Sequence, residues 1–175
     1  MILGAILAGG QARRFGADKA AAQLDGVAMI DRIAAILRPQ VDALVVVGRD
    51  WEGLVSVPDR PAPGLGPLGG LAGALAHAQA EGFTHLLTSG CDLPDLPADL
   101  LAALTPGPAA IAGQPLLGLW PATLAGTLAN YLRGGGDQAM RSWIAHIGTR
   151  RVVLDGPLAN INTQADLAAF LSRSP

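Results

Sequence analysis

The chain has 175 residues, of which 50% are hydrophobic and only 15% are charged, and its formal net charge is -2. This length suits one sizeable hydrophobic core, so we expect a single domain over residues 1–175. The small net charge gives no indication of the strongly basic face that nucleic-acid binding normally requires, and the apolar N-terminus is far shorter than the ~20 residues of a membrane span. The lone Cys91 cannot form an internal disulfide. We therefore expect a cytoplasmic protein with no nucleic-acid or membrane partner.

The first half of the chain alternates between apolar runs and helical patterns. It predicts strands over residues 2–7, 43–47, 54–57 and 83–89, and helices over 27–38 and 67–80. On the first helix, Val27 and Leu37 share one apolar face, and Pro39 marks its end. Pro67 suits the first position of the second helix because its missing N–H needs no partner there.

The second half continues the alternation. It predicts helices over residues 97–104, 122–132 and 137–147, and strands near 109–112, 116–120 and 151–154. Asp137 is a candidate N-cap, and the pattern from Thr163 to Asp166 predicts a capping box at the start of a last helix. The whole order predicts an α/β fold, a three-layer αβα sandwich with a mostly parallel, mixed sheet. In such folds ligands bind at the carboxyl ends of the strands.

A basic, glycine-rich segment follows the first strand directly. It reads Leu7-Ala8-Gly9-Gly10-Gln11-Ala12-Arg13-Arg14-Phe15-Gly16-Ala17-Asp18-Lys19. Glycines let backbone N–H groups approach phosphate oxygens closely, and Arg14 and Lys19 add full positive charges. The spacing matches neither a Walker A loop nor the three-glycine dinucleotide fingerprint. From composition alone, a phosphate site and a solvated basic loop are both open.

Asp92 is the candidate metal ligand. It follows the strand predicted at 83–89 and precedes Leu93-Pro94, so a stiff turn would hold its carboxylate at the ligand crevice. Magnesium prefers oxygen donors and commonly combines one or two carboxylates with substrate phosphates and waters. The alternative interpretation is an ordinary turn aspartate.

Two further motifs precede predicted helices. The first contains Gly66, Leu68 and Gly69, which would bring a helix start close to a base, or serve only as a cap and a tight packing contact. In the second, Asn160 and Asn162 flank one residue, so on an extended segment their amides face the same side. Loop hydrogen bonding is the alternative for this pair.

Taken together, these motifs resemble the molybdenum cofactor guanylyltransferase family. The resemblance rests on Leu7-Ala8-Gly9-Gly10 with Arg14, Gly16 and Lys19, on Gly66-Pro67-Leu68-Gly69-Gly70, on Cys91-Asp92-Leu93-Pro94 and on Asn160-Ile161-Asn162-Thr163. The four motifs stand in the family's order and extend over nearly the whole chain. Four ordered matches carry more weight than any single glycine-rich loop.

The resemblance implies a Rossmann-like nucleotidyltransferase that moves GMP from GTP to the terminal phosphate of molybdopterin-type molybdenum cofactor, with Mg²⁺. It implies as partners GTP, the cofactor, cofactor-delivery proteins and molybdoenzymes. It assigns catalysis to Lys19, Arg14 and Asp92, and Mg²⁺ to Asp92. It assigns nucleotide binding to Leu7, Ala8, Gly9, Gly10, Lys19, Asp59, Gly66, Leu68, Gly69 and Asp92, and the pterin product site to Asn160 and Asn162.

This chain departs from the family pattern at three places. Gly48-Arg49-Asp50 stands where an Asn-x-Asn segment is frequent, Gln114 stands where histidine is frequent, and the segment after Gly136 lacks an arginine. Leu-Ala-Gly-Gly, instead of the Leu-Ala-Ala-Gly usual in related cytidylyltransferases, favours guanine. A cytidylyl- or other nucleotidylyltransferase acting on a small phosphorylated substrate is one alternative, and a non-catalytic GTP- or cofactor-binding protein is another.

Overall fold

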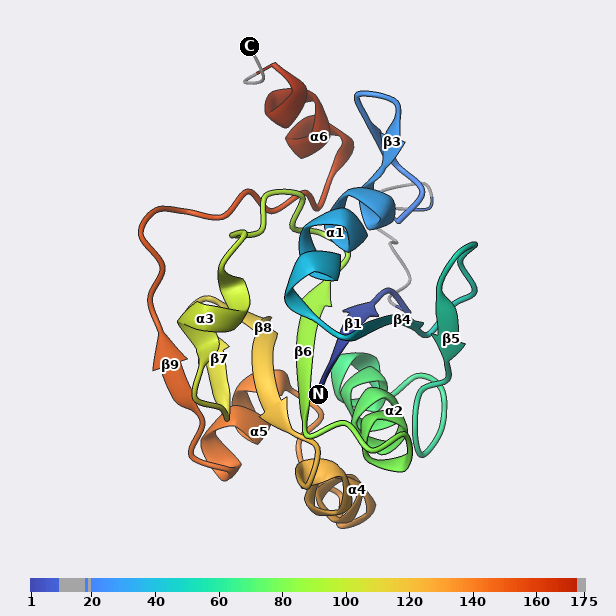
Figure 1. The fold of residues 1–175 in the computed structure, drawn as a ribbon, viewed down its shortest axis with the longest axis vertical. Helices are drawn as coiled ribbons and strands as arrows, with labels where there is room; N and C mark the ends of the chain where they lie inside the picture. The colour runs from blue at the N-terminus through green and yellow to red at the C-terminus, as the bar shows by residue number, and fades with distance from the viewer. Residues whose placement is uncertain (10–17, 19, 173–175) are drawn as a thin grey trace.

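A mixed β-sheet between two layers of helices forms the fold (Figure 1). The computed structural model describes residues 1–9, 18 and 20–172. Within these residues the main sheet has seven strands, in the spatial order β5 (Val55–Val57), β4 (Ala43–Val47), β1 (Ile2–Leu7), β6 (His85–Gly90), β8 (Gln114–Pro121), β7 (Ala109–Ile111) and β9 (Arg150–Val152). The predicted three-layer α/β fold with a mostly parallel, mixed sheet is confirmed.

The four strands β5, β4, β1 and β6 run parallel to one another. Their last residues are level, since Leu7 pairs with both Val47 and Gly90, and Val47 pairs with Val57. The strand β8 runs antiparallel to β6 and β7, and β9 runs parallel to β7. The carboxyl ends of four neighbouring strands therefore lie side by side, and we call this the carboxyl edge of the sheet. Ligands of α/β folds bind at this edge.

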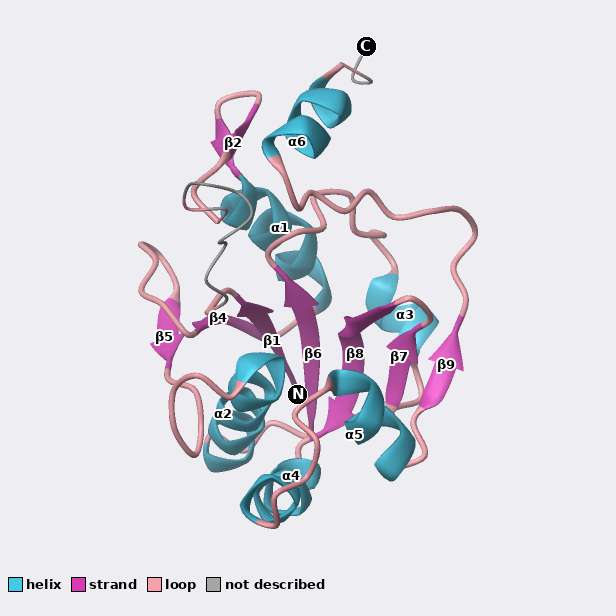
Figure 2. Ribbon diagram, turned by 180° about the vertical axis from the view of Figure 1, so that it is seen from behind, coloured by secondary structure: helices cyan, strands magenta, loops and turns pink. Residues whose placement is uncertain are grey.

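Helices cover both faces of the sheet (Figure 2). One face carries α2 (Gly66–Ala80), α4 (Leu124–Arg133) and α5 (Met140–His146), and the other carries α1 (Met29–Leu37), the short helix η1 (Arg38–Gln40) and α3 (Leu100–Leu104). In β1, Ala5 packs toward the first group and Ile6 toward the second. Burial on both faces explains why the parallel strands read as continuous apolar runs. No helix in the described part of the chain is long and apolar enough to cross a bilayer.

The prediction that Val27 opens the first helix was wrong. Val27 belongs to a small hairpin of β2 (Gln23–Leu24) and β3 (Val27–Ala28), and the helix begins at Met29. The turn residues Asp25 and Gly26 have positive φ values of 52° and 79°, as tight Asp-Gly hairpins require. Val27 is 46% exposed. The Asp-Gly pair was the sequence signal for this hairpin, and it outweighed the helical spacing of Val27.

Three other helix boundaries can be compared with their predictions. The α-helix ends at Leu37, before Pro39 as predicted, and Pro39 lies in η1, a tighter helical turn that follows directly. The helix predicted from residue 97 begins at Leu100, because a turn closed by the Leu100 N–H and the Pro97 carbonyl precedes it. The N-cap of α5 is Ala139, and not Asp137 as predicted. The Asp137 carboxylate instead accepts the Ala139 N–H at 3.1 Å, so it braces the approach to the helix.

The predicted capping box is confirmed at the start of α6 (Gln164–Leu171). Thr163 Oγ1 accepts the Asp166 N–H at 3.1 Å, and the Asp166 carboxylate accepts the Thr163 N–H at 2.8 Å. In Figure 1 this helix lies beside the β2–β3 hairpin. The buried Ile161, just before α6, packs with Leu24 and Met29. This small cluster brings the segment before α6 back to the carboxyl edge of the sheet.

Candidate functional site

The predicted site residues at Leu7, Asp59 and Asp92 lie at or just after the ends of the parallel strands. Leu7 ends β1, Asp59 follows β5 by two residues, and Asp92 follows β6 by two residues. The carboxyl edge of the sheet thus carries all three. The predicted residues Gly10, Arg14 and Lys19 lie outside the described residues, so their roles stay predictions.

The segments after β1 and β4 touch through their backbones. The Ala8 N–H donates to the Val47 carbonyl at 3.0 Å. A Cβ built on Gly48 would lie 2.5 Å from the Cα of Gly9, and Gly48 has a φ of 82°. Both the contact and the backbone angle exclude a larger residue at Gly48. The predicted nucleotide-binding Gly9 therefore lies exposed at the edge, pressed against a glycine that the sequence analysis did not select.

Asp59 lies within this glycine-lined part of the edge. Cβ atoms built on Gly9, Gly48 and Gly70 would lie 3.7, 3.3 and 3.6 Å from Asp59 Oδ1. We call these three glycines and Asp59 the glycine cradle. No hydrogen bond reaches the Asp59 carboxylate from the residues that the structure describes. Burial raises the pKa of Asp59 above its ordinary value, so the carboxylate lies partly desolvated, with no donor among residues 1–9, 18 and 20–172.

Glycines of α2 allow that helix to press against the segment containing Asp59. A Cβ built on Gly73 would lie 2.1 Å from the Pro58 carbonyl oxygen. Nearer the helix start, the Arg60 N–H donates to the Gly69 carbonyl at 3.0 Å. Gly66 is exposed in the first turn, whereas Leu68 is fully buried in the core. Of the predicted contacts here, Leu68 could offer a nucleotide only its backbone.

The structure brings Asp92 close to the segment that contains Asn160 and Asn162. The sequence analysis did not predict this contact. Asp92 Oδ1 lies 2.5 Å from where a Gly90 Cβ would be, so the carboxylate folds back over the end of β6. The Asp92 carbonyl accepts the Ile161 N–H at 2.9 Å. Because Ile161 is buried, its neighbours Asn160 and Asn162 are both exposed beside this strand end.

An unpredicted ion pair joins Arg49 to Asp18. The Arg49 guanidinium donates from Nη1 to Asp18 Oδ1 at 2.6 Å and from Nη2 to Oδ2, a two-pronged contact that we call the Arg49 fork. This hydrogen bonding lowers the pKa of Asp18 and raises the pKa of Arg49. The guanidinium also lies 5.4 Å from the ring centre of Trp51. Since the two partners are 31 positions apart, no local pattern signals the pair.

The carboxylates at this edge fit a magnesium ion held mainly by its ligand. Within the described ranges, no three histidine, cysteine, aspartate or glutamate side chains form a metal-binding group. Asp92, at the end of β6, can supply the one carboxylate that Mg²⁺ needs when phosphates and waters complete its coordination. The donor set therefore suits a metal that arrives with a nucleotide rather than one kept in a protein cage.

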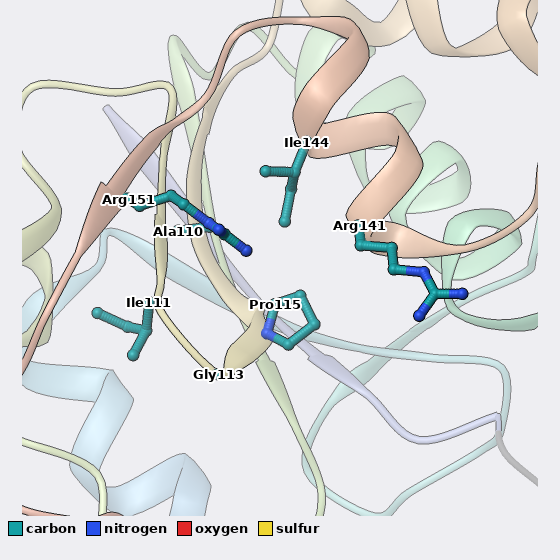
Figure 3. A pocket seen from close by; sticks show the side chains of 7 residues that line it. All are labelled: Ala110, Ile111, Gly113, Pro115, Arg141, Ile144 and Arg151. Carbon is teal, nitrogen blue, oxygen red and sulfur yellow. The ribbon is translucent and has the colours of Figure 1, made fainter.

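A hollow lies on the other half of the sheet, away from these residues (Figure 3). It has a volume of about 200 Å³ and is lined by Ala110, Ile111, Gly113, Pro115, Arg141, Ile144 and Arg151. Figure 3 shows the Arg151 side chain reaching toward Pro115 and Ile144, while Arg141 extends away from it. None of these residues was predicted as functional, although Gln114, one of the departures from the family pattern, stands between two of them.

The chain matches known proteins over most of its length. A family model described as MobA-like NTP transferase domain matches residues 4–152. The molybdenum cofactor guanylyltransferase of Acidiphilium cryptum is 36% identical over 178 residues, which cover 94% of this chain and 91% of that protein.

Solved structures share the fold. The molybdopterin-guanine dinucleotide biosynthesis protein A of Archaeoglobus fulgidus superposes with a TM-score of 0.72 at 23% identity, covering 98% of this chain and 97% of that one. A Mycobacterium tuberculosis protein solved in complex with manganese has a TM-score of 0.65 at 17% identity, covering 99% of both chains. At these identities the superpositions support the fold alone.

Proposed function

The chain belongs to the MobA-like NTP transferase family, and from this membership we propose that it transfers GMP from GTP to the terminal phosphate of molybdenum cofactor. The observation that carries the proposal is the row of level strand ends, where the Gly9 backbone, Asp59 and Asp92 share one edge. A relative named for this activity aligns with 94% of the chain. We propose that residues 1–175 act as one nucleotidyltransferase domain.

The reaction joins two anions. An oxygen of the terminal phosphate of the cofactor attacks the α-phosphorus of GTP and forms a new P–O bond. The bond from the α-phosphorus to the bridging oxygen breaks, and pyrophosphate leaves with the electron pair. Because nucleophile, phosphorus centre and leaving group all carry negative charge, catalysis rests on alignment and on neutralising charge.

The described residues suit the nucleotide side of this reaction. The backbone at Leu7, Ala8 and Gly9 can lie along the nucleotide, since Gly9 is exposed and has no side chain to keep it away. The Asp59 carboxylate, which lacks a donor among the described residues, can accept an N–H or O–H group of the nucleoside. Asp92 would hold Mg²⁺, which neutralises triphosphate charge when bound. Arg14 and Lys19 would supply the remaining positive charge.

The acceptor side rests on Asn160 and Asn162. Their exposed amides stand beside the Asp92 strand end, where they can bind the pterin through donors and acceptors. The product would pass to cofactor-delivery proteins or to molybdoenzymes. The family resemblance supports this assignment, and so does the hydrogen bond that joins Ile161 to Asp92.

Product analysis with four nucleotides tests the proposal. The protein is incubated with Mg²⁺, molybdenum cofactor and either GTP, CTP, ATP or UTP, and the product is identified by its mass. We expect pyrophosphate and a guanine dinucleotide form of the cofactor with GTP. A cytosine product would contradict the base assignment, and GTP binding without pyrophosphate release would indicate a non-catalytic binding protein.

Asp92→Asn should lower kcat by about 100-fold or more, because removing one group that stabilises transition-state charge typically costs that much. The matched control is Asp95→Asn, which removes an exposed carboxylate three positions further along the same loop. Steady-state rates of pyrophosphate release compare the two variants at equal Mg²⁺. Equal rates for Asp92→Asn and the wild type would remove Asp92 from the mechanism.

Lys19 offers a separate test because it is the only lysine in the sequence. An amine-reactive reagent therefore labels one side chain besides the N-terminal amine. If Lys19 binds the triphosphate, GTP with Mg²⁺ should protect it from acylation, as measured by the mass of the labelled peptide. Full labelling at saturating GTP would remove Lys19 from the nucleotide site.

A further inference from the structure

The Arg49 fork is built more firmly than an ordinary surface ion pair. The Trp51 ring under the guanidinium is itself held, since Trp51 Nε1 donates to Asp31 of α1 at 2.7 Å. The Ser56 hydroxyl donates to the Arg49 carbonyl at 2.8 Å, so β5 also fixes the backbone. Neighbours on two elements thus restrain Arg49, and a planar guanidinium restrained in this way dictates where a bidentate carboxylate lies.

Stability alone does not account for this arrangement. The Arg49 and Asp18 side chains are 25% and 47% exposed, and ion pairs with that much solvent contribute about 1 kcal/mol or less. Moreover, Arg49 Nε is buried and has no hydrogen-bond partner in the described part of the chain, which costs stability. A contact that is geometrically strict and energetically modest is better explained by orientation of its partner.

Asp18 occupies a position where orientation matters. It directly precedes Lys19 at the end of the glycine-rich segment, and its carboxylate also accepts the Ala20 N–H at 3.1 Å. Arg49 follows Gly48 of the glycine cradle directly. The Arg49 fork therefore links Asp18 to the end of β4, where Gly48 of the glycine cradle lies.

We propose that Arg49 is a positioning residue of the nucleotide site, which acts by fixing Asp18, the residue that directly precedes Lys19 in the sequence. The inference rests on the proposed function. Arg49 touches neither substrate nor reacting atoms in this role. The Arg49 guanidinium binds the Asp18 carboxylate and lies over the Trp51 ring. Arg49 therefore affects the reaction only indirectly, through the position of the backbone at residue 18.

A double-mutant cycle with a matched control tests this role. The variants are Arg49→Gln, Asp18→Asn and the double variant, and the control is Arg32→Gln. Arg32 forms a comparable set of contacts outside the site, an ion pair with Asp25 at 3.9 Å and a ring contact with Phe170 at 5.8 Å. For each protein we would measure kcat and KM for GTP, the melting temperature and the acylation rate of Lys19 without nucleotide.

We expect Arg49→Gln and Asp18→Asn each to lower kcat/KM by about 100-fold, as small misplacements near a reacting group do, with little change in melting temperature. The double variant should be no worse than either single one, because both remove the same contact. Arg32→Gln should keep wild-type kinetics. The acylation rate of Lys19 should change in both single variants and not in the control.

Other outcomes would overturn the inference. If Asp18→Asn keeps wild-type kinetics while Arg49→Gln does not, Arg49 acts on the ligand directly. If losses in activity follow losses in melting temperature, the fork serves stability only. Failure of the wild type to release pyrophosphate would reject the proposed function instead, and the acylation rates would still decide the positioning role, since they need no substrate.

Discussion

Asp59 and Asp18 lie at the same edge of the sheet, yet their surroundings shift their pKa values in opposite directions. Asp59 is walled by glycines and receives no hydrogen bond from the described residues, and burial raises its pKa. The Asp18 carboxylate accepts hydrogen bonds from the Arg49 guanidinium, and this contact lowers the pKa of Asp18. Among the described residues, the Asp59 carboxylate has no hydrogen-bond donor, whereas the Asp18 carboxylate accepts two N–H groups from Arg49.

The opposite pKa shifts suggest different roles for the two residues. Asp59 is suited to bind a ligand, whereas Asp18 is suited to fix the structure of the site. A partly desolvated carboxylate without a donor reduces the stability of the fold, so its presence calls for a functional reason. The Arg49 fork satisfies its carboxylate within the protein and leaves little capacity for a ligand. Gly48 stands between the two regions, since it borders Asp59 Oδ1 and precedes Arg49.

The largest effect should come from Gly48→Ala, which disturbs both regions at once. A Cβ there would lie 2.5 Å from the Gly9 Cα on a backbone with a φ of 82°. We expect a loss of roughly 2–4 kcal/mol in unfolding free energy from strain and overpacking, together with loss of GTP binding. The control is Gly53→Ala, where φ is 76° and no atom lies within 4 Å of the built Cβ. Urea unfolding and GTP titration would compare them, and equal losses would disprove the close-approach argument.

Asp59→Asn should affect binding more than stability. Loss of a charged acceptor should weaken GTP binding by about 10- to 100-fold. A raised pKa means that ionisation is harder in the folded protein than in the unfolded chain, so the ionised carboxylate costs stability above the ordinary pKa of 3.8. At neutral pH the variant should melt at the same or a higher temperature. A clear fall in melting temperature with unchanged GTP affinity would assign Asp59 a structural role.

Asp18→Asn should have the smallest effect on stability. It should lower the unfolding free energy at neutral pH, whereas Asp59→Asn should leave it unchanged or raise it. Because the folded pKa of Asp18 is lowered, the fork stabilises the protein above the ordinary pKa of 3.8 and loses this effect as pH falls through the lowered value. The variant should be less stable by at most about 1 kcal/mol at neutral pH, and the difference should vanish in acid. Urea unfolding at several pH values measures it. A difference that persists at low pH would contradict the electrostatic origin.

Much of the fold could be predicted because its signals are local. The apolar runs from Ile2 and Ala43 became buried parallel strands, Pro67 stands in the first turn of α2, and Thr163 caps α6. The predictions failed where a neighbouring signal competed, as the Asp-Gly turn did with the helical spacing of Val27. Asp59 and Asp92 could be placed at one edge because parallel strands end on the same side of a sheet.

The sequence by itself determined which residue types follow each strand, and thus the kind of chemistry that this edge can support. Only the tertiary structure decided which of them meet: Gly9 with Gly48, Arg49 with Asp18, and Ile161 with Asp92. The reason is physical. Turns, caps and strand propensities arise between residues a few positions apart, whereas these contacts join segments that only the pairing of strands and the packing of helices bring together.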